Sequence, residues 1–311
     1  MAGINKGKSH IILPKNSNLN RRQNIYACIF FAVLTLIAFL PVLLVIMAAF
    51  SSENSVSMYG YRFIPKEFSV ESFAYMFSTG STLPRSFLNS VIITTAGTIL
   101  SLIIMTPCAY AMSRKEFKLR GALMIYLMIP MIFSGGLVST YMVNTQVLHL
   151  KNTYLALIMP GLCSTWYLML LRNYFLTTVP DSLIESAKLD GALPFTAFIK
   201  IVLPICRPVV MTVAVFQIFS YWNSWYPALL YIDTNHTGLY PLQYVLVNID
   251  RSIQAMILDA QYMSGMTGNY TPPSITLRMA MVVIAIAPIM ILFPFFQRFL
   301  KTGLTVGSVK G

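Results

Sequence analysis

Charged side chains are scarce in this sequence: only 10% of the 311 residues are Asp, Glu, Lys or Arg. A soluble domain usually carries about a quarter charged residues, because its surface must be hydrated. Hydrophobic residues make up 56% of the chain and its mean hydropathy is +0.67. A soluble fold of this composition would expose large apolar patches. The composition therefore excludes an ordinary soluble protein or a disordered chain and indicates a polytopic membrane protein.

Cysteine patterns and catalytic motifs are missing as well. The cysteines show no CxxC or Cys/His spacing and lie in or beside apolar runs, so we expect small buried hydrophobes. They are Cys28, Cys108, Cys163 and Cys206. The sequence also has no P-loop, HExxH or GxSxG motif. We therefore expect no catalytic site, no metal site and no cofactor bound by this chain.

Six apolar runs are long enough to cross a bilayer, which takes about 20 residues of helix. They cover residues 25–50, 87–112, 121–144, 153–174, 205–232 and 275–299. The first run follows Arg21 and Arg22 and ends in two alanines, as a signal peptide might. Its apolar stretch exceeds the roughly 7–15 residues of a signal-peptide core, so we interpret it as an uncleaved span.

Lysine and arginine are distributed unequally between the connections. Sixteen of the 22 lie in the two terminal segments and in the connections after the second and fourth runs; six lie on the opposite side. The positive-inside rule therefore predicts cytoplasmic termini. Because the net charge of +12 is concentrated in short clusters between apolar runs, we expect no nucleic-acid partner.

Acidic residues are absent from all six runs, and the three histidines lie outside them. Ion-coupled carriers usually keep such residues at membrane depth, so this absence argues against secondary transport. The energy for any transport should come from outside the chain. Prolines within the runs predict kinks, either in pore-lining helices or at simple packing sites.

The connection over residues 180–204 has the pattern of a helix–turn–helix. Asp181 or Ser182 can cap the first helix, and Ser182 with Glu185 makes a capping box. The first helix should run to Leu189 and break at Gly191. Pro194 suits the first turn of a second helix, which Pro204 should end. Four apolar residues of this second helix, Phe195, Phe198, Ile199 and Val202, predict one face that could dock in another protein's groove.

The spacing within this connection resembles the EAA loop of bacterial ABC-importer membrane subunits, EAA-x3-G-x9-I-x-LP. The matching residues are Glu185, Ser186, Ala187, Gly191, Ile201, Leu203 and Pro204, with Ser186 in place of the usual second alanine. From its residues alone, the loop could instead be an amphipathic segment at the membrane surface.

The resemblance implies a coupling helix seated in a cleft of a cytoplasmic ATPase subunit. It implies that Glu185 pairs with a basic residue of that subunit, that Gly191 forms the turn, and that Leu203-Pro204 leads into the fifth span. Asp190-Gly191-Ala192 is the form seen in carbohydrate importers.

Other stretches resemble maltose-type carbohydrate importers and extend the resemblance to roughly residues 85–311. Residues 219–227 are similar to the family's W-N-x-[FW]-x-x-P stretch, and residues 303–311 to its G-x-x-x-G-x-V-K-G tail. Leu88-Asn89-Ser90 also fits the family.

Four residues near the outer end of the fifth run could line a sugar path: Trp222, Asn223, Trp225 and Tyr226. Aromatic rings stack on the C–H faces of sugars, and an amide can pair with hydroxyls. The same residues could instead form the aromatic belt common to membrane spans, or simply pack. Both interpretations remain open on sequence grounds.

The C-terminal ten residues have no helical stripe, and composition alone predicts a dispensable end. The resemblance implies a tail that reaches between the ATPase subunits and includes Gly303, Gly307 and Lys310.

Two long external loops are predicted over residues 51–86 and 233–274. The second carries a helical apolar stripe: Leu242, Val245, Leu246, Ile249, Ile253, Met256, Ile257 and Ala260. This stripe could lie on the membrane surface, whereas the resemblance implies contact with an extracytoplasmic binding protein.

We therefore expect an all-α integral membrane protein with six transmembrane helices, cytoplasmic termini and a type I ABC-importer permease fold. The expected segments are a cytoplasmic tail (1–24), a first helix (25–50), an external loop (51–86), a permease core (87–301) and a cytoplasmic tail (302–311). The core includes the EAA loop (180–204) and the external loop 233–274.

The resemblance implies a non-catalytic permease subunit in a bacterial cytoplasmic membrane that imports a sugar or oligosaccharide. Its implied partners are a second homologous permease, two ATPase subunits that hold ATP and Mg²⁺, an extracytoplasmic solute-binding protein and membrane lipid. The alternatives are an ABC permease for a non-sugar solute and, less favoured, a secondary transporter.

The charge asymmetry generates a topology prediction. Membrane-impermeant labels should fail to reach tags at Lys15, Lys118 or Lys310 in intact cells, because these positions follow the positive-inside rule. Tags in the loop 233–274 should be labelled. Labelling of the Lys118 tag from outside would contradict the six-span topology.

Overall fold

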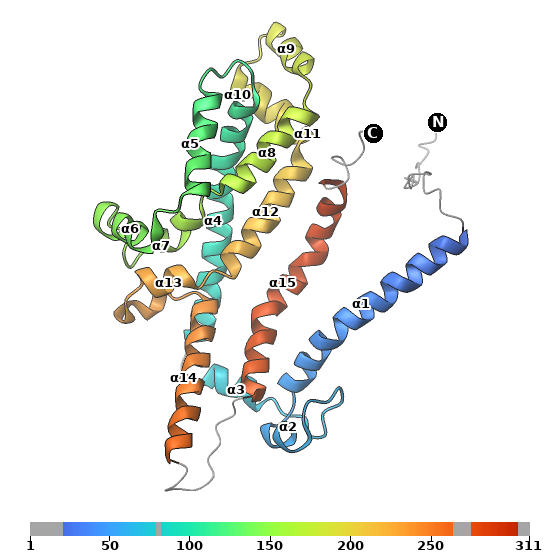
Figure 1. The fold of residues 1–311 in the computed structure, drawn as a ribbon, viewed down its shortest axis with the longest axis vertical. Coiled ribbons are helices and arrows are strands. Elements are labelled where there is room, and N and C mark those ends of the chain that lie inside the picture. Colours follow the sequence, from blue (N-terminus) through green and yellow to red (C-terminus); the bar gives the residue numbers. More distant parts are fainter. Residues whose placement is uncertain (1–20, 79–81, 264–274, 304–311) are drawn as a thin grey trace, which may run out of the picture.

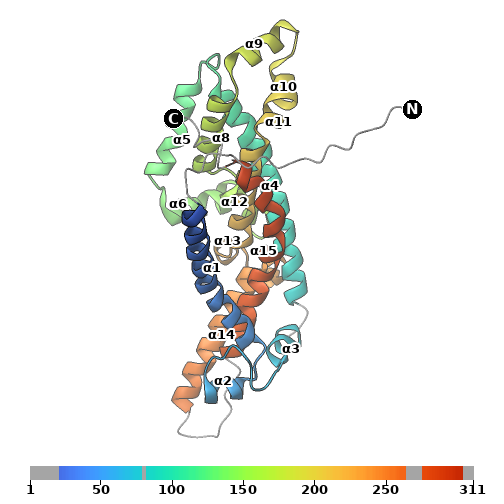
Figure 2. The ribbon, with the colours of Figure 1, turned by 90° about the vertical axis from the view of Figure 1, so that its right-hand side faces the viewer.

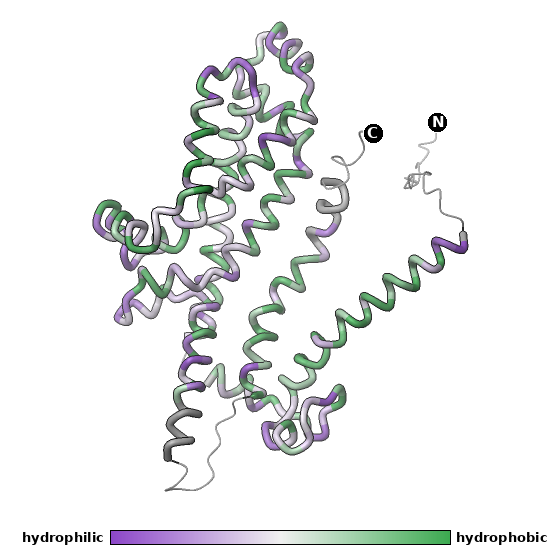
Figure 3. Tube along the Cα trace, viewed as in Figure 1, coloured by the Kyte–Doolittle hydropathy of each residue, from purple (hydrophilic) through white to green (hydrophobic). Residues whose placement is uncertain are grey.

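The computed structural model describes residues 21–78, 82–263 and 275–303, and these residues are mainly helical (Figure 1). Four apolar helices form the centre of the described part: α1 (Arg21–Ala49), α4 (Thr82–Ser113), α12 (Arg207–Trp222) and α15 (Ile275–Gly303). Helix α4 packs against α8 (Thr165–Thr178) and α12, while α15 packs against α12 and α1. The apolar colour of Figure 3 follows α1, α5 and α15, whereas polar residues gather in the connections.

Within the described residues, three helices are long and apolar enough to cross a membrane alone: α1, α4 and α15. They match the first, second and sixth predicted runs. Three bent helix pairs also pass the length and hydropathy test, which makes up to six spans if each pair is one crossing.

The third predicted run is sharply bent. It divides into α5 (Arg120–Ile132) and α6 (Gly136–Met142), which continues as a π-turn over Val143–Val147, and the two arms meet at 118°. Gly135 and Gly136 lie at this bend; Gly136 has a positive φ of 81°, and nothing in the described chain lies within 4 Å of its Cβ position. These two glycines therefore interrupt the helix, and the apolar run over 121–144 is not straight.

The fourth and fifth predicted runs are also interrupted. The fourth consists of α7 (Tyr154–Ile158), a 3₁₀ turn over Met159–Gly161 and α8, with a bend of 51°. The fifth ends as a regular helix at Trp222 and resumes in α13 (Tyr226–Tyr231). Pro160 explains the interruption of the fourth run, as the prolines within the runs predict. The turn after Trp222 interrupts the fifth run, and apolar composition alone does not predict it.

Two apolar cores lie at different levels of the molecule. One surrounds Leu168, Leu171 and Phe175, between α4, α8 and the connection after α8. The other surrounds Tyr221, Trp222 and Leu277 and joins α4, α12, α14 (Leu242–Met263) and α15. Both views place α9 (Asp181–Leu189) at one end of the molecule and α14 at the other (Figures 1 and 2).

Side chains of α12 donate hydrogen bonds to backbone carbonyls at the break in the fourth run. The Tyr221 hydroxyl donates to the carbonyl of Ile158 at 2.9 Å, and the Gln217 amide donates to that of Gly161 at 3.1 Å. Both side chains are buried. Because lipid offers no hydrogen bonds, such pairing is what permits a broken helix at membrane depth.

Polar side chains near the start of α4 hold the segment that leads into α14. The Asn89 amide donates to the carbonyls of Gly238 (2.8 Å) and Tyr240 (3.1 Å), and the Leu242 amide donates to the Ser90 hydroxyl at 2.7 Å. These two residues belong to the Leu88-Asn89-Ser90 stretch noted in the sequence.

Helix α14 confirms the predicted stripe in the second external loop. Leu242, Val245, Leu246 and Ile253 are buried, and the helix packs against α4 and α15. This half of the stripe therefore packs within the chain. Met256, Ile257 and Ala260 continue the same helix.

A close approach between α4 and α12 generates a stability prediction. A Cβ on Gly97 would lie 2.6 Å from the Tyr221 ring, which is itself held by its hydrogen bond to Ile158. Gly97→Ala should therefore lower stability by about 1–3 kcal/mol through overpacking. Thermal unfolding of the purified protein in detergent measures this. Gly121→Ala is the matched control, because nothing lies within 4 Å of its Cβ position; equal melting temperatures for the two variants would contradict the prediction.

Candidate coupling loop and membrane path

The connection after α8 folds as two short helices separated by a glycine turn. Helix α9 ends at Leu189, and α10 (Pro194–Ala197) begins with proline at its first turn, as the sequence predicts. Gly191 has φ +81°, and the amide of Ala192 donates to the carbonyl of Ala187 at 2.9 Å. A left-handed residue just after a helix is the usual place for glycine.

The ends of these helices differ from expectation in two respects. Helix α9 begins after Pro180 without a side-chain cap, so the capping box of Ser182 and Glu185 does not form. Pro204 does not end the second helix: it lies inside α11 (Leu203–Ile205), and the bend of 80° into α12 follows at Cys206. A π-turn over Phe198–Val202 precedes this proline, and its wider spacing accommodates a residue without an amide hydrogen.

The predicted apolar face of the second helix is divided in two. Phe198 and Val202 are buried in the chain's own core, and Phe198 stacks on Tyr110 with 5.1 Å between ring centroids. Phe195 and Ile199 are 67% and 45% exposed. The π-turn changes the angular spacing, so the four side chains cannot share one free surface. Only Phe195 and Ile199 remain available to a partner.

A buried arginine anchors α9 to the rest of the chain. The guanidinium of Arg114, just after α4, donates to the Phe175 carbonyl at 3.2 Å and to Asp181 Oδ1 at 3.4 Å. The side chain of Arg114 is only 8% exposed. In the sequence, Arg114 belongs to a basic cluster with Lys115, Lys118 and Arg120, and nothing in that cluster distinguishes it from its exposed neighbours.

Further ion pairs hold α9 in place. Lys115 donates to Asp181 at 2.9 Å, and this hydrogen bond, with a smaller effect from Arg114, holds the pKa of the Asp181 carboxyl below its ordinary value. Lys188 pairs with Glu116. The connection after α4 therefore supports both ends of α9.

Glu185 is the exception on this helix. It is exposed, whereas Ile184 and Ala187 are buried on the inner side. Among the residues that the structure describes, Glu185 has no hydrogen-bond or ion-pair partner, while the other two charged residues of α9, Asp181 and Lys188, are both paired. Ser186 donates back to the carbonyl of Ser182, and Asp190 is exposed at the turn. Ile201 and Leu203 are half-buried.

A groove of about 410 Å³ lies beside the two short helices α9 and α10. It lies between the end of α4, the connection that follows it and α10. Its lining combines aromatic rings with charged side chains, among them Tyr110, Phe117, Phe195, Arg114 and Lys188.

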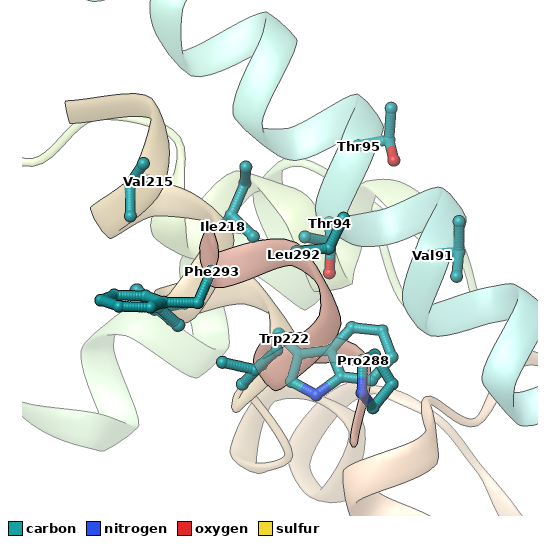
Figure 4. A pocket seen from close by; sticks show the side chains of 11 residues that line it. Val91, Thr94, Thr95, Val215, Ile218, Trp222, Pro288, Leu292 and Phe293 are labelled. Carbon is teal, nitrogen blue, oxygen red and sulfur yellow. The ribbon is translucent and has the colours of Figure 1, made fainter. Parts of the chain in front are cut away.

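The four residues of the candidate sugar path have different surroundings. Trp222 is buried: its indole nitrogen donates to the Ala285 carbonyl at 3.0 Å, and its ring meets Phe87 edge-on. It lines a cavity of about 90 Å³ with Thr94 and Pro288 (Figure 4). Trp222 therefore packs against neighbouring helices of its own chain.

The other three residues are more accessible. Asn223 is exposed and donates to the Phe219 carbonyl at 2.9 Å, and Tyr226 is 44% exposed. Trp225 is half-buried, with its ring edge-on to Tyr226 and 5.7 Å below the guanidinium of Arg251. Aromatic faces of this kind remain candidates for contact with a sugar.

The predicted C-terminal tail falls largely beyond what the structure describes. Gly303 is the last residue of α15, and Gly307 and Lys310 lie outside the described residues.

The fold defines the class of protein. A bacterial ABC transporter that imports the acidic polysaccharide alginate contains a chain with the same fold: the TM-score is 0.73 at 22% identity, over 90% of this chain and 98% of that one. No family model matches the sequence. The described helices thus have the arrangement of an ABC-importer permease.

Curated relatives identify the family. The polygalacturonan/rhamnogalacturonan transport system permease protein YtcP of Bacillus subtilis (strain 168) is 36% identical, over 91% of this chain and 96% of its own. Protein LplC of the same organism is 34% identical, over 95% and 97%. The arabinooligosaccharide permease AraQ of Halalkalibacterium halodurans is 29% identical, over 90% and 94%.

The chain belongs to the family of carbohydrate ABC-importer permeases and is an integral membrane protein. The relatives are transport permeases, and in such systems a partner subunit hydrolyses ATP.

The Arg114 contacts generate a third prediction. Arg114→Ala should destabilise the packing of α9 on α8, because losing a charge-assisted hydrogen bond such as that to the Phe175 carbonyl costs about 1.5–3 kcal/mol. The measurement is protease cleavage within residues 180–204 of the purified protein, which should become faster. Lys118→Ala is the control: this lysine of the same connection is exposed and has no ion pair among the residues that the structure describes, so cleavage should change little. An unchanged cleavage rate in Arg114→Ala would exclude this anchoring role.

Proposed function

We propose that α9 and α10 form the coupling loop through which a cytoplasmic ATPase drives this permease. The observation that supports the assignment is the unpaired, outward-facing Glu185 on a helix whose other charges are paired within the chain. An exposed carboxylate on a helix that is held in place by its other ion pairs can form an ion pair with a basic residue of a partner protein. Ser186, Ala187, Asp190, Gly191, Ile201, Leu203 and Pro204 are the other proposed loop residues, with Gly191 setting the turn.

The proposed topology has six spans and both termini in the cytoplasm. The three long helices and three bent pairs supply the number, and the unequal distribution of Lys and Arg supports the orientation. In this orientation α9 faces the cytoplasm, whereas α2 (Glu53–Tyr59), α3 (Glu71–Ser78) and α14 face outward.

The proposed substrate is a sugar or oligosaccharide. Support comes from the relatives, whose names specify polygalacturonan/rhamnogalacturonan and arabinooligosaccharides, and from accessible aromatic side chains beside Asn223. Trp225, Tyr226 and Asn223 are the proposed contacts on this chain, and Trp222 supports them from the core. Stimulation of ATP hydrolysis by a panel of oligosaccharides, measured on the reconstituted complex with its binding protein, tests this assignment.

The proposed complex contains a second, homologous permease, two ATPase subunits and an extracytoplasmic solute-binding protein. ATP and Mg²⁺ belong to the ATPase subunits, and this chain contributes binding and movement without covalent chemistry. Closure of the ATPase dimer would move the two coupling loops together and open the path outward. The C-terminal tail, including Gly303, Gly307 and Lys310, is proposed to contact the ATPase subunits.

Removal of the free carboxylate tests the coupling role. Glu185→Ala should strongly reduce transport and substrate-stimulated ATP hydrolysis, because removing one partner of a buried interfacial charge pair typically costs about 2–5 kcal/mol. Both rates are measured in proteoliposomes that contain the complete complex.

A matched control separates this effect from a loss of negative charge in general. Glu71→Ala removes an exposed carboxylate at the opposite end of the molecule and should leave both rates unchanged. Full transport by Glu185→Ala at native expression would refute the coupling assignment.

A further inference from the structure

The segment that follows α1 is closed into a loop at the very end of that helix. The amide of Ser52 donates to the Glu67 carbonyl at 3.1 Å, and the amide of Ser69 donates to the Phe50 carbonyl at 2.9 Å. The rings of Phe50 and Phe68 stack in parallel with 5.5 Å between centroids. Both ends of the loop are therefore fixed beside Ala49, the last residue of α1.

One side of this loop is attached to the protein. Ser55 and Val56 of α2 are buried. The carboxylate of Glu53 accepts hydrogen bonds from the amides of Ile275 (3.1 Å) and Thr276 (3.0 Å), at the start of α15. A carboxylate at a helix N-terminus is favourable, so this side of the loop is held against the first turn of α15.

The other side exposes large apolar side chains. Ile64 is 81% exposed, Met58 77% and Phe68 72%, and Tyr61 and Phe63 are each about half exposed. In an aqueous loop such a group of residues is unusual, and exposed patches of this size normally mark a binding surface.

Two cations accompany these apolar residues. The Lys66 ammonium lies 3.5 Å from the centroid of the Tyr59 ring, and the Arg62 guanidinium lies 5.4 Å from it. The nearby carboxylates are engaged elsewhere: Glu53 binds the start of α15, and Glu67 accepts a hydrogen bond from the Ser52 hydroxyl. Residues 58–68 therefore combine tyrosine, phenylalanine and isoleucine with two cations.

The membrane boundary is adjacent to this loop. Helix α1 has 29 residues and a length of about 43 Å, more than the roughly 30 Å of a hydrocarbon core. Its apolar stretch continues to its last residue, so the end of α1 reaches the bilayer interface, and the residues that follow lie at or just beyond it. Both views place α2 directly at the end of α1 (Figures 1 and 2).

We propose that residues 58–68 form an interfacial anchor, which inserts Tyr61, Phe63 and Ile64 among the headgroups of the leaflet next to the end of α1. Arg62 and Lys66 contact the lipid phosphates while their stems lie along apolar surface. Aromatic residues and cations are the residue types enriched at this depth. Under the proposed topology this is the outer leaflet, and the surface is distinct from the coupling loop and the sugar path.

A solute-binding protein is the other partner that could cover this side. Lipid is favoured because the loop is fixed at the end of a membrane-spanning helix and therefore reaches the interface whether or not another protein is bound.

The test is a depth measurement on the complete complex in nanodiscs of phosphatidylethanolamine and phosphatidylglycerol. A nitroxide is attached to Ile64→Cys after the four native cysteines are replaced by alanine, and its collisions with lipid-soluble oxygen and a water-soluble nickel chelate are compared. Collisions with oxygen should dominate at position 64. At the control Asn235→Cys, a polar exposed position, collisions with the nickel chelate should dominate.

Two further measurements separate the possible outcomes. Adding Phe63→Asn should shift the label at position 64 toward the nickel chelate, because an anchoring ring has been removed. Equal access of the nickel chelate to positions 64 and 235 would overturn the proposal. The proposal would also be overturned if the label is water-accessible in the complex without the solute-binding protein and becomes immobilised only when that protein is added, since the surface would then be a protein interface.

Discussion

Lipid supplies no hydrogen bonds, so each backbone group at membrane depth must find its partner within the protein. This constraint explains the central part of the molecule. The interrupted helix before α8 presents the carbonyls of Ile158 and Gly161 to α12, and Tyr221 and Gln217 of α12 donate hydrogen bonds to them. Because the Tyr221 ring must reach across to Ile158, the facing position of α4 has room only for glycine, Gly97. The packing of α4 on α12 thus follows from a break elsewhere in the chain.

A second set of polar contacts holds α9 in place, at the end of the molecule that the proposed topology puts outside the lipid. Arg114 and Lys115 hold Asp181, while Glu116 holds Lys188, so consecutive residues after α4 determine where α9 lies. Since Arg114 also binds the end of α8, the loop is fixed to two helices at once. A force applied to α9 is therefore transmitted to α4 and α8 together.

Part of the fold and part of the proposed coupling loop can be predicted from the local sequence. The long apolar runs predict α1, α4 and α15, because length and hydropathy suffice for a single helix. Gly191 and Pro194 predict the turn between α9 and α10, because both residues restrict the backbone in known ways. The burial of Trp222 and Arg114 depends on which distant helix faces them. Neither can be deduced from neighbours in sequence. The π-turn before Pro204 divided an apolar face that a regular helical period would have kept whole.

The pairing of α1 with α15 has a consequence for biosynthesis. The two helices lie near opposite ends of the chain, and Glu53 meets Ile275 across 222 residues of sequence. Apart from Ala48 and Ala49 at its end, the described part of α1 has no residue buried within the chain. During translation α1 must therefore wait in the bilayer, surrounded by lipid or by other proteins, until α15 has been made. Contacts of such long range form late. Although α1 enters the membrane before the helices that follow it, it is among the last of them to reach its final place, and a chain truncated before α15 would leave it without its main neighbour.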